Sequence, residues 1–315
     1  MCRKTWRIRH KKVGRKHNRV FQKSVIDYLS QCSLSSYRLS RIKLISEDKL
    51  NNRLTQSRDL FLSKIRWSTL PRKAPLVVVA DAMMQTINHK IYCIYLILVK
   101  KPQEHRAIIV KPLILPGLES QPGWKRAFDK IPPFTLNSIE AIVCDGHIGL
   151  VNYARRRNWI IQRCHFHILA AIQGRRSKSG YSRHQDIGKI IYQAVYQIIH
   201  NQYMKKVDLL SQLFQLEHIS QNTHSKGLAR ILRGFITNHS DYLSYVNYPK
   251  LNLPTTTNAA ESTISGMRNL LYRAKGFRTL KSLELWIFAL LKYKKSVSCN
   301  GHLPTKFLRS AFVIA

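Results

Sequence analysis

The chain has 315 residues, with 53 Lys and Arg against 16 Asp and Glu, and a formal net charge of +37. Because 44% of its residues are hydrophobic, the composition excludes a disordered polycation and supports a packed core. So high a charge destabilises a compact chain by self-repulsion unless an anionic partner is near. We therefore expect a nucleic acid as partner, with ribosomal or membrane-surface binding as the alternative.

Cysteine spacing and hydropathy indicate the compartment. The six cysteines never form a Cys-x-x-Cys pair, which argues against a disulfide framework and agrees with a reducing cytoplasm. The basic residues 1–16 contain no apolar stretch of the kind that a secretory signal requires. The longest apolar run, at 91–99, is too short to cross a bilayer. We expect a cytoplasmic protein with no membrane partner.

Three segments precede the first predicted strand. Residues 1–17 form a basic arm that either contacts phosphates or is a solvated tail. Residues 18–63 show helical spacing with Ser36 and Ser46 as caps, which predicts three short helices. This region is compatible with a helix-turn-helix DNA-binding module, although any small helical bundle would share its pattern. Residues 64–75 hold two prolines and form the predicted linker.

The pattern from residue 76 to residue 300 predicts a mixed α/β catalytic domain, followed by a tail at 301–315. Apolar runs predict strands at 76–80, 91–99, 107–110, 139–144 and 159–162. Helical spacing predicts helices at 123–130 and 147–157. A helical insertion at about 165–250, without convincing strands, completes the predicted domain.

Three carboxylates stand out in so basic a chain. Asp81 and Asp145 each follow an apolar run, so both lie at or near a predicted strand end. Considered singly, each carboxylate has another explanation. Asp81 can be a helix cap or an ion-pair partner, and Asp145 can belong to an Asp-Gly turn. Glu261 can complete a capping box with Asn258 as the N-cap. Together, two such aspartates and a glutamate near a helix start can bind two divalent cations for an in-line phosphoryl displacement. Mg²⁺ suits this task because it binds carboxylates together with substrate phosphates.

A Cys-x-x-His pair, Cys164 and His167, lies in the segment after the last predicted strand. This spacing is half of a zinc-type ligand set. No second pair follows at a familiar spacing, and only His147 or His184 suggests itself as a partner. We therefore expect no zinc in this chain and a structural role for the pair beside the active site. A cysteine nucleophile is not supported, because no nucleophile–base pattern accompanies it.

Four passages carry a resemblance to a known family. They are Val78-Val79-Ala80-Asp81, residues 143–147 ending in Asp-Gly-His, residues 162–167 with the Cys-x-x-His pair, and residues 253–261 with Thr-Thr-Asn-Ala-Ala-Glu. The chain resembles bacterial insertion-sequence transposases of the Mutator type, whose catalytic residues are two aspartates and a glutamate. The resemblance runs from about Leu76 to Ser296, and its motifs are specific only jointly.

The resemblance implies an RNase H-like core, as in retroviral integrases, with a large helical insertion. It assigns Asp81, Asp145 and Glu261 as catalytic ligands of Mg²⁺, for which Mn²⁺ could substitute, and Cys164 and His167 as supporting residues. It implies cleavage at terminal inverted repeats of double-stranded DNA and joining of the 3′ ends to target DNA. It further implies a homo-oligomer during synapsis and a location on the bacterial nucleoid.

Basic clusters provide candidates for contact with the DNA backbone, each of which could equally be a solvated charge. They are Arg155, Arg156, Arg157, Arg175, Arg176, Arg268, Arg273, Lys275 and Arg278. Two other functions remain open: an inactive copy that only binds DNA, and an RNase H-like nuclease without strand transfer. Similar proteins often begin with a zinc ribbon of two Cys-x-x-Cys pairs, of which Cys2 is the only remnant here. We expect either a truncated copy or a start inside a longer reading frame.

Overall fold

The structure is a computed structural model that describes Leu29 and residues 36–72, 75–178, 182–274 and 277–301, without the side chains of residues 36 and 175–186. The predicted basic arm at 1–17, nearly all of 18–35 and the tail from 302 onward lie outside the described residues. The chain forms two compact units. The first comprises Met1–Ser68, Gln85–Ile91 and Thr263–Lys295, and the second comprises Thr69–Met84, Tyr92–Ser262 and Ser296–Ala315. This division cuts across the predicted domain at 76–300.

In its described part, the first unit is mainly helical. It contains α2 (Ser36–Ile42), α3 (Glu47–Lys64), α14 (Leu280–Lys294) and the larger part of α13 (Asn258–Arg273). The helices predicted from Ser36 and Ser46 are confirmed, and the Ser46 side chain caps α3 by accepting a bond from the Lys49 amide. Helix α3 packs against α14, with the Arg58 guanidinium 5.2 Å from the ring centre of Trp286.

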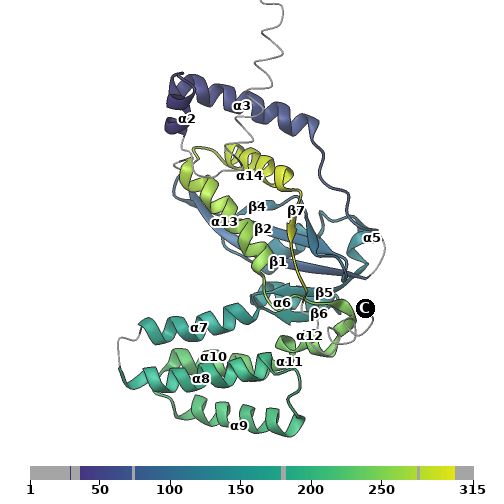
Figure 1. Cartoon of the computed structure of the whole chain (residues 1–315), viewed down its shortest axis with the longest axis vertical. Helices are drawn as coiled ribbons and strands as arrows, with labels where there is room; N and C mark the ends of the chain where they lie inside the picture. Colours follow the sequence, from purple (N-terminus) through teal and green to yellow (C-terminus); the bar gives the residue numbers. More distant parts are fainter. Residues whose placement is uncertain (1–28, 30–35, 73–74, 179–181, 275–276, 302–315) are drawn as a thin grey trace, which may run out of the picture. The chain divides into compact units, whose positions relative to one another are not determined.

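The second unit is built on a seven-stranded mixed sheet of order β6-β5-β1-β2-β3-β7, with β4 also paired to β2 (Figure 1). The strands are β1 (Leu76–Ile87), β2 (Lys90–Lys100), β3 (Arg106–Ile109), β4 (Leu113–Pro116), β5 (Ile139–Cys144), β6 (Ile160–Arg163) and β7 (Ser296–Ser298). Strands β5 and β6 run parallel to β1, whereas β3, β4 and β7 pair antiparallel. The five predicted strands are confirmed. The short strands β4 and β7 were not predicted, because prolines flank the apolar residues of β4 and because β7 contains a single apolar residue.

Strand β1 continues well beyond the apolar run that predicted it. The prediction that Asp81 lies at or near a strand end is therefore wrong, since β1 extends to Ile87. A two-residue turn at Asn88 and His89, both with positive φ (47° and 62°), joins β1 to β2. Such turns match the twist of an antiparallel hairpin, and pairing with β2 keeps the less apolar residues after Asp81 extended.

One face of the sheet carries the main apolar core. Alternate residues of β1, namely Leu76, Val78 and Ala80, pack with the buried faces of α4 (Gln121–Phe128) and α6 (Ile148–Arg156). The predicted helices at 123–130 and 147–157 are thus confirmed, and the short α5 (Pro133–Leu136) lies between them in the chain. Four aromatic rings form a contiguous cluster in this core: Trp124, Phe128, Tyr153 and Trp159. The β1–β5 region that supports Asp81 and Asp145 therefore rests on a dense core.

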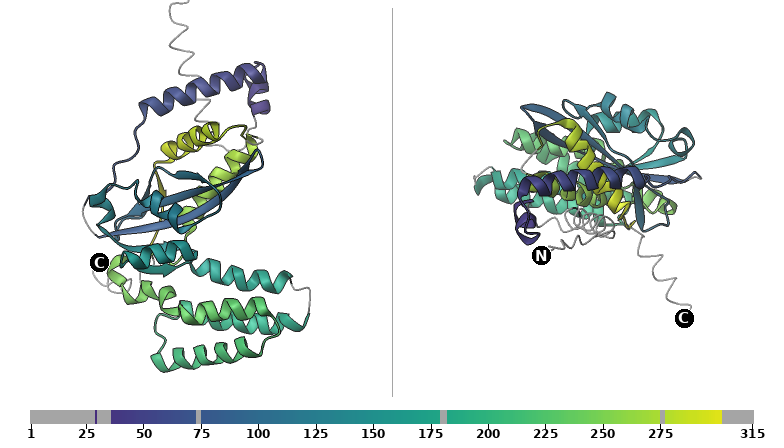
Figure 2. Two further views of the ribbon diagram at one scale, coloured as in Figure 1. Left: turned by 180° about the vertical axis from the view of Figure 1, so that it is seen from behind. Right: turned by 90° about the horizontal axis from the view of Figure 1, so that it is seen from above.

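Residues 165–251 form the predicted helical insertion. Helices α7 (His165–Lys178), α8 (Ser182–His200), α9 (Lys206–Asn222) and α10 (Lys226–Thr237) lie side by side around a second apolar core (Figure 2). Three short helices follow: α11 (His239–Tyr242), α12 (Ser244–Asn247) and η1 (Pro249–Leu251). Within the described residues of this stretch the structure contains no strand, as predicted.

Buried polar contacts fasten the insertion to edge strand β6. The side-chain amide of Gln162 donates to the Tyr242 carbonyl (3.0 Å), and its oxygen accepts from the Tyr245 amide (2.8 Å). The Ser244 hydroxyl donates to the Ile161 carbonyl (2.7 Å). These bonds satisfy polar groups that would otherwise be buried at a sheet edge. Among the described helices, none is long and apolar enough to span a membrane.

Candidate active site

Two aspartates lie at matching positions, Asp81 within β1 and Asp145 just after the end of the neighbouring parallel strand β5. Strands β1 and β5 pair Val79 with Val143, and each aspartate follows its valine by two residues, so the two lie near each other and the charge of Asp145 acts on Asp81. Paired strands are about 4.8 Å apart, which brings these two side chains to one place on the sheet. The Asp81 carboxylate accepts a bond from the Ala82 amide (2.8 Å), and the Asp145 carboxylate accepts one from the His147 amide (2.9 Å). Both carboxylates are thus held by local backbone.

The three predicted carboxylates are close enough for their charges to affect the pKa of Asp81. The pKa of Asp81 is raised to about 7, first by burial and next by the charge of Asp145. Glu261 raises this pKa further, while the Ala82 amide and His167 lower it. Carboxylates gathered in a partly buried site resist ionisation together unless a cation neutralises them. The donor set consists of hard oxygens, which fits Mg²⁺ or Mn²⁺.

Glu261 reaches the site from the first turn and a half of α13. That helix begins at Asn258, and the Glu261 amide donates to the Thr257 carbonyl (2.9 Å). The capping box considered for Glu261 and Asn258 is therefore not formed, because Asn258 is already inside the helix. Instead, the fully buried Thr257 hydroxyl donates to the Glu261 carboxylate (2.7 Å). This bond fixes the carboxylate orientation.

The Cys-x-x-His pair lies directly beside Glu261. Cys164 is fully buried at the junction of β6 and α7, and the His167 ring nitrogen Nδ1 is 3.6 Å from Glu261 Oε1. Thr257 contacts both residues of the Cys-x-x-His pair. Its amide nitrogen lies 3.3 Å from the Cys164 sulfur, and its hydroxyl oxygen lies 3.5 Å from His167 Nδ1. A hydrogen bond with Cys164 is the largest cause that raises the pKa of His167 to about 9, and burial opposes it.

A further carboxylate, Glu119, belongs to the same neighbourhood and was not predicted. Its Oε1 lies 3.1 Å from His147 Nδ1 and accepts a bond from the Trp124 indole (2.7 Å). Burial raises the pKa of Glu119, the Trp124 bond and His147 lower it, and the charge of Asp145 raises it. His147 is therefore the partner of Glu119 and not, as considered, of the Cys-x-x-His pair. No motif marks Glu119, which lies in the loop before α4.

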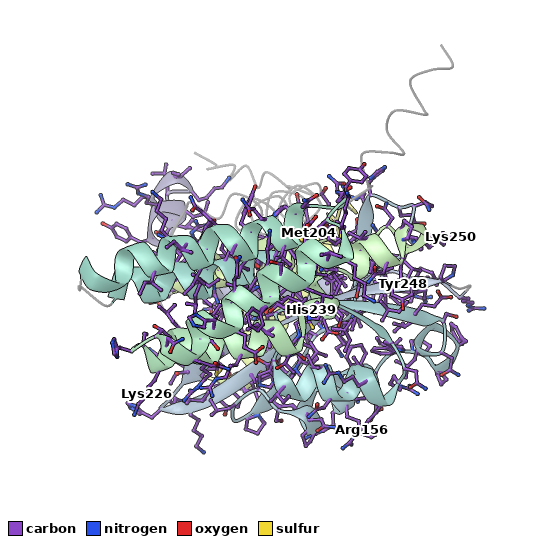
Figure 3. The ribbon with its side chains drawn as sticks, turned by 90° about the horizontal axis from the view of Figure 1, so that it is seen from below. Arg156, Met204, Lys226, His239, Tyr248 and Lys250 are labelled. Atoms are coloured by element: carbon purple, nitrogen blue, oxygen red, sulfur yellow. The ribbon has the colours of Figure 1, made fainter. Side chains whose placement is uncertain are left out.

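The predicted DNA-contact residues have different surroundings. The Arg155 guanidinium donates hydrogen bonds to Asn238 (3.0 Å) and to Asp241 (3.3 Å), so it joins α6 to the segment around α11. The exposed residues among them are Arg155, Arg156, Arg157, Arg268 and Arg278, while Arg273 is half-buried. The side chains of Arg175 and Arg176, the whole of Lys275 and the side chain of His184 lie outside the described residues. Figure 3 shows Arg156 well separated from Lys226 and Lys250 of the insertion, so these charges are dispersed.

The fold and the site define a strongly basic α/β protein with a carboxylate cluster beside a Cys-x-x-His pair. The sequence model of the family described as "Transposase, Mutator family" matches residues 26–295. The chain therefore belongs to the Mutator family of transposases, which confirms the resemblance noted in its motifs. No curated protein matches the chain. Transposases act on DNA, in agreement with the polyanionic partner predicted from the charge.

Proposed function

We propose that this chain is a DNA transposase that binds terminal inverted repeats, cleaves at the element ends and joins the 3′ ends to target DNA. The convergence of Asp81, Asp145 and Glu261 from β1, β5 and α13 is the observation that carries this proposal. Three carboxylates in one partly buried site, on a protein of charge +37, suit metal-dependent phosphoryl transfer on a polyanion.

We propose an RNase H-like core with a helical insertion as the scaffold for this chemistry. The sheet order supports it: β2 and β3 pair antiparallel next to β1, and β5 and β6 pair parallel on the other side. The first aspartate lies on the first strand and the second lies just after the strand beside it. The insertion separates the second aspartate from the glutamate in sequence.

Asp81, Asp145 and Glu261 would hold the divalent cations. When bound, Mg²⁺ supplies charge neutralisation at the phosphate and activation of the attacking oxygen. The protein's own contribution is orientation: the backbone amides of Ala82 and His147 fix the two aspartates, and Thr257 fixes Glu261. Exposed arginines such as Arg156 and Arg268 would contact phosphates of the DNA backbone. A homo-oligomer would form when two element ends are brought together.

Cleavage of labelled DNA that carries the flanking inverted repeat tests this proposal. Purified protein is incubated with Mg²⁺ or EDTA, and nicks at the repeat boundary and joined products are scored separately. Asp145→Asn should lower cleavage at least ~10³-fold while DNA binding persists, because binding rests on Lys and Arg. Asp129→Asn is the matched control, since Asp129 is an exposed aspartate that pairs only with Lys125 in the described contacts.

Undiminished cutting by Asp145→Asn in Mg²⁺ would contradict the assignment of Asp145. Specific binding without any nicking by the unmodified chain would identify an inactive, DNA-binding copy. Nicking without joined products would identify a nuclease that lacks strand transfer.

A further inference from the structure

Three side chains of different chemistry meet beside the carboxylate site. The Cys164 sulfur, a ring nitrogen of His167 and a carboxylate oxygen of Glu261 all lie within 4.8 Å of one another. We propose that these three residues form a binding site for Zn²⁺, contrary to the expectation of no zinc. The third ligand escaped sequence analysis because it follows His167 by 94 positions, far outside any familiar ligand spacing.

The separation of the His167 and Glu261 ligand atoms is close to that of a tetrahedral site. With Zn–S near 2.3 Å and Zn–N or Zn–O near 2.0 Å, adjacent ligand atoms lie about 3.3 to 3.6 Å apart. His167 Nδ1 and Glu261 Oε1 are 3.6 Å apart, and the upper bound on the other separations is 4.8 Å. Closing any remaining gaps requires the ligand side chains to rotate toward the ion. The protein supplies three ligands, so a fourth position stays open for water or a substrate atom.

Backbone hydrogen bonds hold together the segments that carry the proposed ligands. The Cys164 amide donates to the Cys144 carbonyl (2.8 Å), which anchors the start of the Cys-x-x-His segment to the end of β5. The His165 amide donates to the Thr255 carbonyl (2.8 Å), which ties this segment to the loop before α13. Because these bonds hold the segments of Cys164 and Glu261 in place, less conformational free energy is needed to assemble a metal site.

Thr257 provides the outer contacts that such a site needs. Its amide donates to the Cys164 sulfur (3.3 Å), which orients the atom that would bind the metal. Its hydroxyl donates to Glu261 (2.7 Å) and orients that carboxylate. Cys164 is fully buried, whereas the side chains of His167 and Glu261 are 36% and 31% exposed. The site is thus closed behind the sulfur and accessible from the carboxylate side.

The ligand chemistry selects the ion. A thiolate and an imidazole favour Zn²⁺ over Mg²⁺, which prefers oxygen ligands and keeps its waters. Because Glu261 is also a proposed magnesium ligand, Zn²⁺ bound here would compete for that carboxylate and slow cleavage. This consequence rests on the proposed function, whereas the zinc site itself rests only on the three ligands.

Cobalt substitution tests the site by spectroscopy. The full chain is stripped with chelator and titrated with Co²⁺, and we expect a thiolate-to-cobalt charge-transfer band that saturates at one ion per chain and disappears on addition of Zn²⁺. Cys164→Ser should abolish the band. Thr257→Val should weaken Co²⁺ binding by about 10- to 100-fold. Cys299→Ser, at a buried cysteine outside the cluster, and a Cys2→Ser/Cys32→Ser variant should leave the band unchanged.

Absence of the band in the unmodified chain, or its persistence in Cys164→Ser, would overturn the site. Circular dichroism of each variant shows that a lost band does not reflect unfolding. Asp145→Asn separates the two proposals, because it should lose DNA cleavage and keep the cobalt band. A zinc site without cleavage and cleavage without a zinc site are therefore distinguishable results.

Discussion

At the residue scale, the candidate site depends on a few partly buried polar contacts. The backbone amides of Ala82 and His147 hold the two aspartates, and the Thr257 side chain holds Glu261. Such groups are costly to bury unless they are bonded, so each bond both stabilises the fold and fixes a carboxylate. Thr257 is the most informative of these residues, because one hydroxyl lies near the Cys164 sulfur, His167 and Glu261 together.

Thr257→Val removes the hydroxyl at nearly constant volume. We expect the free energy of unfolding to fall by about 1 kcal/mol, because one buried hydrogen bond is lost. We expect cleavage to fall more than this loss of stability explains, by about 10- to 100-fold, since Glu261 is no longer oriented. Urea denaturation and single-turnover cleavage measure the two effects. Thr256→Val, at a half-buried neighbour, is the control and should change neither by a comparable amount.

Lys100 gives a prediction about pH and stability. Its side chain is fully buried, its amine donates to the Cys299 carbonyl (3.1 Å), and burial lowers its pKa below the ordinary 10.5. Between the lowered pKa and 10.5 the unfolded chain binds the proton more fully than the folded one, so this residue makes stability rise with pH. Lys100→Met should remove that contribution. Denaturation at several alkaline pH values measures it, and an unchanged difference between the two proteins across this range would contradict the lowered pKa.

At the element scale, close packing of helices and strands sets the position of the site. Helix α6 begins at Ile148, shortly after Asp145, and its start packs on the start of α4, which Glu119 precedes in the chain. A Cβ atom at Gly149 would lie 2.6 Å from the backbone nitrogen of Gln121. Backbone cannot move aside as a flexible side chain can, so only glycine allows these helices to approach so closely.

Gly149→Ala should therefore destabilise the protein by about 1 to 3 kcal/mol through overpacking. The control is Gly234→Ala, because Gly234 is an exposed residue of α10 whose added Cβ meets no atom within 4 Å. The control should be neutral or stabilise the protein by up to about 1 kcal/mol, as alanine favours helix over glycine. Thermal denaturation of both variants shows whether each substitution stabilises or destabilises the protein. Equal effects at the two positions would show that helix propensity, and not the α4–α6 contact, controls stability.

At the scale of the whole molecule, net charge and its distribution decide how DNA is bound. The charge of +37 is dispersed along the chain, and some of the few described acidic groups lie inside the carboxylate site. Binding that rests on many phosphate contacts releases counterions, so affinity falls steeply with salt. The exposed arginines should act in this way, each without preference for a base sequence.

The double variant Arg156→Gln/Arg268→Gln tests this distribution. If both side chains contact phosphates, the slope of log affinity against log salt should become less negative by about 0.9 for each contact. Binding titrations at several salt concentrations, on specific and unrelated DNA, measure the slope. Lys101→Gln is the control, since this exposed lysine is paired with Glu104 (3.2 Å). The same change of slope per charge in the control would show that charge acts diffusely rather than through contacts.

Local sequence determined the parts of this protein that depend on periodicity and burial. Apolar runs located β1, β2, β3, β5 and β6, because a strand covered on both faces needs continuous apolar residues. Helical spacing located α3, α4 and α6, and it correctly separated the helical insertion from the sheet. The motifs around Asp81, Asp145 and Glu261 sufficed to indicate the Mutator family, which the family match confirmed.

Only the tertiary structure decided which distant groups meet. Pairing with β2 placed Asp81 inside a strand, the contact of α3 with α14 joined the two ends of the first unit, and packing of α4 brought Glu119 to His147. The meeting of Cys164 and His167 with Glu261 belongs to the same class. The burial pattern of a strand or helix can be read from neighbouring residues. These contacts instead depend on how elements that are remote in sequence pack together, which no local pattern of residues determines.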